Sequence, residues 1–152
     1  YEVVLTLAIL EYCRRINGII GLHVWSLTDL FHEPTLNYNR LEVWLTDAIR
    51  RVSGGGTNPS LIIKKMEEYS NYLWVILTDL LWPKDDIKRF VALLARRKRN
   101  ETILVVYGSE FKHCTSISLE ALQRKSIFIY AEELGENTIR LVLRKLRKIV
   151  KK

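Results

Sequence analysis

The sequence predicts an α/β fold: a Rossmann-like three-layer sandwich with a mostly parallel central sheet and helices on both faces. Two observations lead to this prediction. Apolar runs of five to nine residues alternate along the chain with longer amphipathic segments, an order that builds a parallel sheet. The apolar runs are also hydrophobic at successive positions, which is typical of strands covered on both faces. With 152 residues, the chain is expected to form a single domain, residues 1–152.

Helices are predicted where apolar residues recur every three or four positions. They cover residues 1–17, 38–52, 57–69, 83–97, 119–125 and 135–152. The first ends at Asn17 and Gly18, which accept a left-handed backbone, and Pro83 suits the first turn of the fourth. The segment 38–52 is the clearest, because its apolar residues form one stripe with most charged residues away from it.

Strands are predicted where β-branched and apolar residues follow one another without a helical period. They cover residues 19–27, 72–78, 102–107 and 126–130. Residues 28–39 are expected to form a loop, with room for a short edge strand. His23 lies inside the first strand, where a hydrogen-bonded core histidine is the simplest interpretation.

The positive charge is concentrated at one end of the chain. Of the 24 basic residues, seven lie in residues 140–152, which leaves 17 to balance the 17 acidic ones. The apolar stripe of this last helix is predicted to contain Ile139, Val142, Leu143, Leu146, Ile149 and Val150. The opposite face carries Arg140, Arg144, Arg147, Lys148 and Lys151. This face is either a solvated surface or a surface for an acidic partner such as nucleic acid, an anionic membrane or an acidic protein.

The composition bears on where the protein is expected to be located. No apolar run reaches the roughly 18 residues that a membrane-spanning helix needs. Cys13 and Cys114 lie far apart without metal-type spacing, so two free thiols in a reducing compartment are favoured over a disulfide, and a cytoplasmic location is expected. The sequence opens with Tyr1, and its only methionine is Met66, so we expect the natural start to lie upstream.

Carboxylates follow one buried strand. Because ligands of open parallel sheets bind beyond the carboxyl ends of the strands, Asp79 occupies a candidate ligand position. It also has a structural interpretation, in which the carboxylate caps the loop that follows. Asp85 and Asp86 lie in the first turn of the next helix, where acids favour the helix dipole.

Other motifs carry less chemistry. His113 and Cys114 are adjacent, but a catalytic dyad forms in space and adjacency is no argument for one. The three histidines do not cluster. The basic run of residues 96–99 is interpreted as a solvated helix end.

The stretch SGGGTNPS, residues 53–60, raises a separate question. It is either a plain connection between helices or a loop that brings backbone and the Thr57 hydroxyl close to a ligand, since glycine permits close approach. It lacks the lysine of a phosphate-binding P-loop and does not follow a strand.

The order of these features resembles the von Willebrand factor A (vWA) domain, along almost the whole chain. In that family, three loops at the top of the sheet form a metal-ion-dependent adhesion site. The GGGT stretch of residues 54–57 resembles the second loop, and the Leu-Thr-Asp ending at Asp79 resembles the third. The first loop, Asp-x-Ser-x-Ser, has no counterpart here; it either lies upstream of Tyr1 or has been lost.

The resemblance implies a non-catalytic protein-interaction module, often a subunit or adaptor within a larger complex. Thr57 and Asp79 would hold Mg²⁺, and a vacant position on the ion would accept a carboxylate from the partner. Two alternatives stay open. One is a metal-dependent phosphoesterase with Asp79 and Asp85 or Asp86 as ligands; the other is a nucleic-acid-binding protein that uses the basic last helix.

Overall fold

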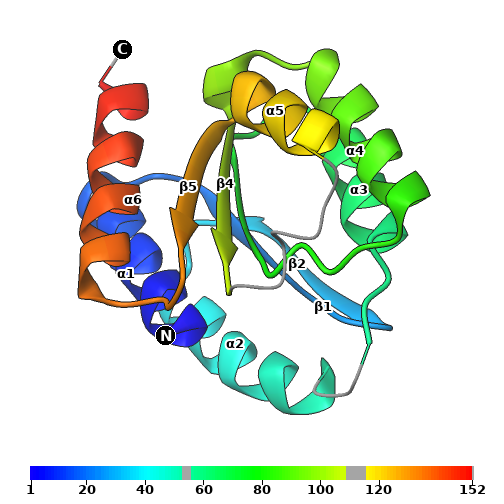
Figure 1. Cartoon of the computed structure of the whole chain (residues 1–152). Helices are drawn as coiled ribbons and strands as arrows, with labels where there is room; N and C mark the ends of the chain where they lie inside the picture. The colour runs from blue at the N-terminus through cyan, green and yellow to red at the C-terminus, as the bar shows by residue number, and fades with distance from the viewer. Residues whose placement is uncertain (53–55, 109–115, 152) are drawn as a thin grey trace. The chain divides into compact units, whose positions relative to one another are not determined.

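The computed structural model describes residues 1–52, 56–108 and 116–151. Its elements in chain order are α1 (Glu2–Arg15), β1 (Ile20–Trp25), β2 (Asp29–Thr35), α2 (Tyr38–Val52), α3 (Ser60–Glu68), β3 (Trp74–Thr78), α4 (Lys84–Ala95), a 3₁₀ turn (Arg99–Glu101), β4 (Thr102–Tyr107), α5 (Ser116–Lys125), β5 (Ile127–Ala131) and α6 (Glu136–Val150). They fall into two compact units, Tyr1–Ile62 and Ile63–Lys152, which we describe separately (Figure 1).

The second unit contains a parallel three-stranded sheet in the order β3-β4-β5. Trp74 pairs with Thr102 at one end of the sheet, and Tyr107 pairs with Ala131 at the other. Figure 1 shows α4 and α5 on one side of this sheet and α6 on the other. The predicted α/β architecture with a parallel sheet flanked by helices is therefore confirmed for this unit.

The core of the second unit lies around the central strand. The first five residues of β4 are fully buried, which explains why its sequence is apolar at successive positions. Phe90 and Leu94 of α4 are equally buried, and the Phe90 ring meets Trp82 edge-to-face at 5.1 Å. Each such side chain stabilises the fold by about 1.5–3 kcal/mol through removal of apolar surface from water.

The first unit contains an antiparallel hairpin, which corrects one expectation. Residues 19–27 were expected to join the parallel sheet, but β1 pairs antiparallel with β2 in a two-stranded sheet. Most of the segment 28–39, expected to be a loop with a possible edge strand, forms β2. The turn between the strands is three residues long, whereas a parallel connection needs a dozen or more. Taken as whole residues, all six positions of β1 are half-buried, although the His23 side chain itself is only 3% exposed, so the strand lacks the full burial expected of a strand covered on both faces.

Gly21 allows the two strands of the hairpin to come close. The register shifts between Ile20 and Leu22, at Gly21. A Cβ atom at this glycine would lie 2.9 Å from the carbonyl oxygen of His32 and 3.1 Å from the nitrogen of Pro34. Glycine inside a strand is typical of such irregular pairing.

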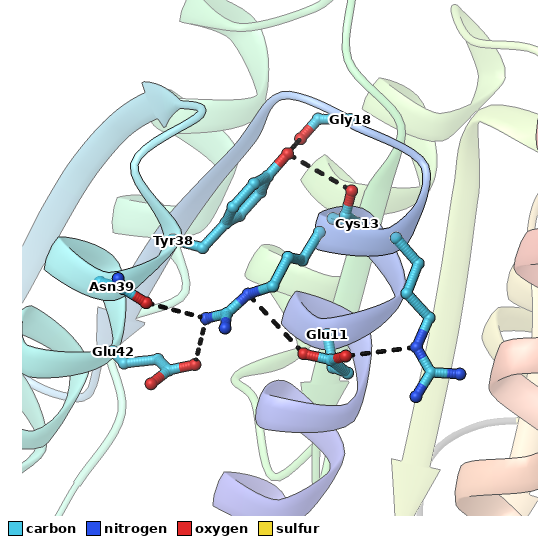
Figure 2. Close-up of polar contacts among 8 residues, drawn as sticks. Glu11, Cys13, Gly18, Tyr38, Asn39 and Glu42 are labelled. Carbon is cyan, nitrogen blue, oxygen red and sulfur yellow. Dashed lines mark hydrogen bonds and ion pairs between the residues drawn. The ribbon is translucent and has the colours of Figure 1, made fainter.

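Polar contacts connect α1 to α2 within the first unit (Figure 2). Arg14 donates from Nη2 to Glu42 at 2.7 Å and to Asn39 at 3.3 Å, and its guanidinium lies 5.8 Å from the centre of the Tyr38 ring. The Tyr38 hydroxyl donates to the carbonyl oxygen of Gly18 at 2.8 Å. These contacts secure the end of α1, because a backbone carbonyl beyond its last turn receives a side-chain donor.

Arg97 holds the amino ends of β3 and β4 and is the one residue of the basic run 96–99 that departs from the expected solvated helix end; the other three are exposed. Its guanidinium donates to the carbonyl oxygens of Ser70 and Tyr72, each at 2.8 Å, and of Glu101 at 2.9 Å. The neighbouring Arg99 donates to the carbonyl oxygen of Ser126 at 3.1 Å. Burial lowers the pKa of the Arg97 guanidinium, and the charge of Glu101 acts in the opposite direction. The planar guanidinium with several donors suits this task better than an ammonium group would.

Candidate functional site

Asp79 follows the carboxyl end of β3 and is partly buried. Its Oδ1 accepts a hydrogen bond from the backbone N–H of Leu81 at 3.1 Å. The carboxylate therefore caps its own turn, as the structural interpretation of the sequence allowed. This contact uses one oxygen of the carboxylate.

The turn after β3 has an unusual backbone. Leu80 has φ of 59°, although it is a fully buried residue with a branched side chain. The Thr78 hydroxyl accepts a hydrogen bond from the Leu80 N–H at 2.9 Å. Non-glycine residues seldom adopt positive φ, and such strain persists where the surroundings fix it. The side chains of Thr78 and Asp79 thus accept from the successive N–H groups of Leu80 and Leu81, and these two contacts hold the turn.

The loop before α3 is held at both ends by one residue. The Ser26 hydroxyl donates to the carbonyl oxygen of Val52, the last residue of α2, at 2.9 Å. The Ser26 carbonyl oxygen accepts from the Asn58 N–H at 2.8 Å. Ser26 follows β1 directly, so the chain on either side of the glycine stretch is fixed beside the carboxyl end of that strand. Ser53, Gly54 and Gly55 lie outside the described residues.

Gly56 has a conformation that requires glycine. Its φ is 107°, and a Cβ atom would lie 2.9 Å from side-chain atoms of Leu27. Thr57 comes next and is partly buried in the loop before α3. Glycine at position 56 thus permits two things: a backbone conformation that would strain other residues, and a close approach to Leu27 in the hairpin turn.

The two residues predicted to hold a metal belong to different units. Thr57 lies in the first unit, at the carboxyl end of β1, and Asp79 lies in the second, at the carboxyl end of β3. Their convergence stays a prediction. A hydroxyl and a carboxylate are oxygen donors of the kind that Mg²⁺ prefers, although two such groups leave most of its six positions to water or to a partner.

The other acidic candidates lie on α4. Asp85 and Asp86 are in its first turn, and Asp86 lies 3.5 Å from Nη1 of Arg89. Among the residues that the structure describes, no group of three or more His, Cys, Asp or Glu side chains is placed to bind a metal ion. Within residues 1–52, 56–108 and 116–151, the geometry therefore adds no ligand to those that the sequence suggested for the phosphoesterase hypothesis.

The surroundings of His23 and Cys13 favour structural roles for these two residues. His23 is almost fully buried, and its Nε2 lies 2.8 Å from Oδ2 of Asp29 on the paired strand, as expected for a hydrogen-bonded core histidine. Burial raises the pKa of the Cys13 thiol, which reduces its nucleophilic thiolate form. His113 and Cys114 lie outside the described residues.

The last helix presents the basic face that the sequence predicted. Arg140, Arg144, Arg147, Lys148 and Lys151 are exposed. The opposite face packs inward through Thr138, Val142 and Leu146. One expectation was wrong: Val150 is 50% exposed and does not belong to the buried stripe, because it lies in the last turn of the helix.

Sequence reasoning missed the residues that support the candidate site. Ser26 and Leu27 were assigned to a strand, and Thr78 was treated only as part of a motif. Ser26 and Leu27 act through tertiary contacts with Val52, Asn58 and Gly56, and Thr78 acts through a local bond to the Leu80 N–H; none of these contacts leaves a periodic pattern. The only available indication was a hydroxyl residue at the end of each strand.

No helix within the described ranges is both long enough and apolar enough to cross a membrane. No family model matches the chain, and neither the curated proteins nor the solved structures give a significant match.

Proposed function

We propose that this chain is a protein-interaction module of vWA type, which binds a partner carboxylate through Mg²⁺ held by Thr57 and Asp79. The observation that supports the proposal is the fixed position of both candidate ligands beside strand ends. Ser26 fixes the chain on either side of the glycine stretch to the end of β1, and Asp79 is fixed after β3 by its own turn.

Each residue has a defined part in this proposal. Asp79 contributes the charge that attracts the cation, through the oxygen that Leu81 does not use. Thr57 contributes a neutral oxygen, and Gly56 lets the backbone take the conformation that precedes it. When bound, the ion supplies a coordination position that an acidic side chain of a partner can fill.

Partner recognition would then depend on an acidic residue rather than on an extended apolar surface. The site is expected to discriminate by charge and by oxygen chemistry, and to need no catalytic group. We expect the partner to be a protein, within a larger assembly.

Titration calorimetry with Mg²⁺ tests the proposal on the whole chain. Asp79→Asn removes the charge but keeps an amide oxygen for the Leu81 N–H, so the turn is preserved. Thr57→Val removes the hydroxyl with little change in shape. Each substitution is expected to weaken Mg²⁺ binding at least tenfold, equivalent to about 1.4 kcal/mol.

Asp85→Asn is the matched control, because it removes one exposed carboxylate from the first turn of α4. It should leave Mg²⁺ affinity unchanged. The proposal fails if Asp79→Asn binds Mg²⁺ as the wild type does, or if Thr57→Val has no effect. A glutamate-containing peptide that binds wild type only with Mg²⁺ present would support the bridging role of the ion.

A further inference from the structure

We propose that the basic face of α6 binds the phosphate backbone of double-stranded nucleic acid. The basic face is defined by Arg144, Arg147, Lys148 and Lys151, with Arg140 at its margin. It shares no residue with the candidate metal site, and the inference does not depend on that site.

The four cations have no acidic partner among the described residues, whereas several other basic side chains are paired with a carboxylate or with backbone carbonyls. Arg140 pairs with Glu136 one turn earlier. Arg97 and Arg99 are bound to backbone carbonyls. Arg96 pairs with Glu67, and Lys65 pairs with Glu68. Like charges at these intervals on one helix face repel one another, and a bound polyanion would relieve this repulsion.

The length of the basic face along the helix axis matches the spacing of several successive phosphates in a duplex. Positions 144, 147, 148 and 151 are neighbours at three- and four-residue intervals, so they lie on one face. At 1.5 Å per residue, the face extends over about 10 Å along the helix axis. A duplex presents one phosphate per strand about every 3.4 Å, so this length corresponds to roughly three successive phosphates.

The composition of the face favours a duplex over other anionic partners. α6 contains no aromatic residue, so it offers no stacking platform for the bases of a single strand. Of its apolar residues, Val142 and Leu146 are buried and only Val150 is exposed, which is too little apolar surface to anchor the helix in a lipid layer. Two of the four cations are arginine, whose planar donors match phosphate oxygens in pairs.

Fluorescence anisotropy with a 24-base-pair duplex tests the proposal. For three contacted phosphates, the logarithm of affinity should fall against the logarithm of salt concentration with a slope of about −2.7, or roughly 40-fold between 50 and 200 mM salt. Affinity should be equal for A·T-rich and G·C-rich duplexes, because backbone contacts carry no sequence information.

The test variant carries Arg144→Gln, Arg147→Gln, Lys148→Gln and Lys151→Gln. Glutamine keeps a similar helix propensity, so α6 should persist in the circular dichroism spectrum. Duplex binding should be lost, or its salt slope should approach zero. The single substitution Arg147→Gln should reduce the slope by about one, which provides a milder version of the same measurement.

The control variant carries Arg40→Gln, Lys64→Gln, Lys84→Gln and Lys88→Gln, which removes the same charge from exposed positions on other helices. It should bind the duplex as wild type does. Equal losses in both variants would overturn the proposal, because net charge alone would then explain binding. Stronger retention on phosphatidylserine vesicles, or displacement of the duplex by polyglutamate at equal charge, would also overturn it.

Discussion

The backbone N–H of Asn58 donates a hydrogen bond to the carbonyl oxygen of Ser26 across 2.8 Å, and this contact joins the loop before α3 to the turn of the hairpin. The Ser26 hydroxyl secures Val52 in the same way on the other side of the loop. A glycine-rich segment between two helices is therefore held at both ends. This arrangement makes the loop sensitive to changes at Gly56, which lies against the same turn.

Gly56→Ala is expected to destabilise the first unit by about 1–2 kcal/mol, because alanine is strained at φ of 107°. The exposed Leu27 side chain can move aside, so the backbone supplies most of the cost. Hydrogen exchange at the Asn58 amide should become faster. Gly18→Ala is the control, since its new Cβ would meet Ile16 only at 3.4 Å. Unchanged exchange at Asn58 would contradict the role assigned to Gly56.

Arg97→Lys is expected to destabilise the second unit by about 2–4 kcal/mol, because one ammonium group cannot reach the carbonyl oxygens of Ser70, Tyr72 and Glu101 together. Chemical denaturation measures this loss. Arg96→Lys is the matched control. Arg96 is exposed, and its ion pair with Glu67 is long, with 3.5 Å between Nη2 and Oε1. Its effect should stay within about 0.5 kcal/mol. Equal effects of the two substitutions would show that Arg97 does not fasten the strand ends.

His23→Ala is expected to destabilise the hairpin by about 2–3 kcal/mol, because it removes a buried ring and leaves Asp29 without its cross-strand hydrogen bond. Asp29→Asn should cost less, since an amide oxygen remains to accept from His23. Thermal unfolding of both variants provides the comparison. Glu33→Gln, on an exposed position of β2, should leave the midpoint unchanged. A larger loss in Asp29→Asn than in His23→Ala would contradict this account.

Cys13 makes stability depend on pH in the alkaline range. Burial raises the pKa of its thiol above the ordinary value of 9.0, so the folded state holds the proton more strongly than the unfolded chain does. This contribution is fully present below pH 9 and is lost as pH rises through the folded pKa. In a Cys114→Ser background, alkylation of Cys13 at pH 8 should be slower than alkylation of a short peptide that contains it. An equal rate would show that the thiol is not protected, and a Cys13→Ala variant should lose the alkaline dependence.

Local patterns predicted most of the elements well. The helix predicted for residues 38–52 is α2 with the same bounds, and the strand at 102–107 is β4. Both predictions succeed because burial leaves a pattern in the sequence. The helix α2 is buried on one face and so repeats apolar residues every three or four positions, and the strand β4 is buried on both faces and so is apolar at successive positions. The weakest prediction was β2, where Asp29, His32 and Glu33 break the apolar pattern because the strand is only half-buried.

The sequence suggested the two candidate ligands, Thr57 and Asp79, but not the residues that hold the chain around them, such as Ser26 and Thr78. The motif around Asp79 is readable because carboxylates often follow buried strands. The contacts of Ser26 are tertiary and leave no local pattern, and nothing in the residue type of Leu80 predicts its positive φ. The pairing of β1 was also predicted wrongly: a parallel sheet was expected, and the strand pairs antiparallel with β2. The direction of pairing follows from the short turn between the strands, not from the sequence of β1 itself.

The unpaired cations of α6 also affect the helix itself. Self-repulsion among them lowers its melting temperature at low ionic strength, so sodium chloride should stabilise the second unit while it weakens attachment to DNA. A bound polyanion would instead raise the melting temperature in dilute buffer. Heat resistance and nucleic acid retention should therefore respond to salt with opposite signs.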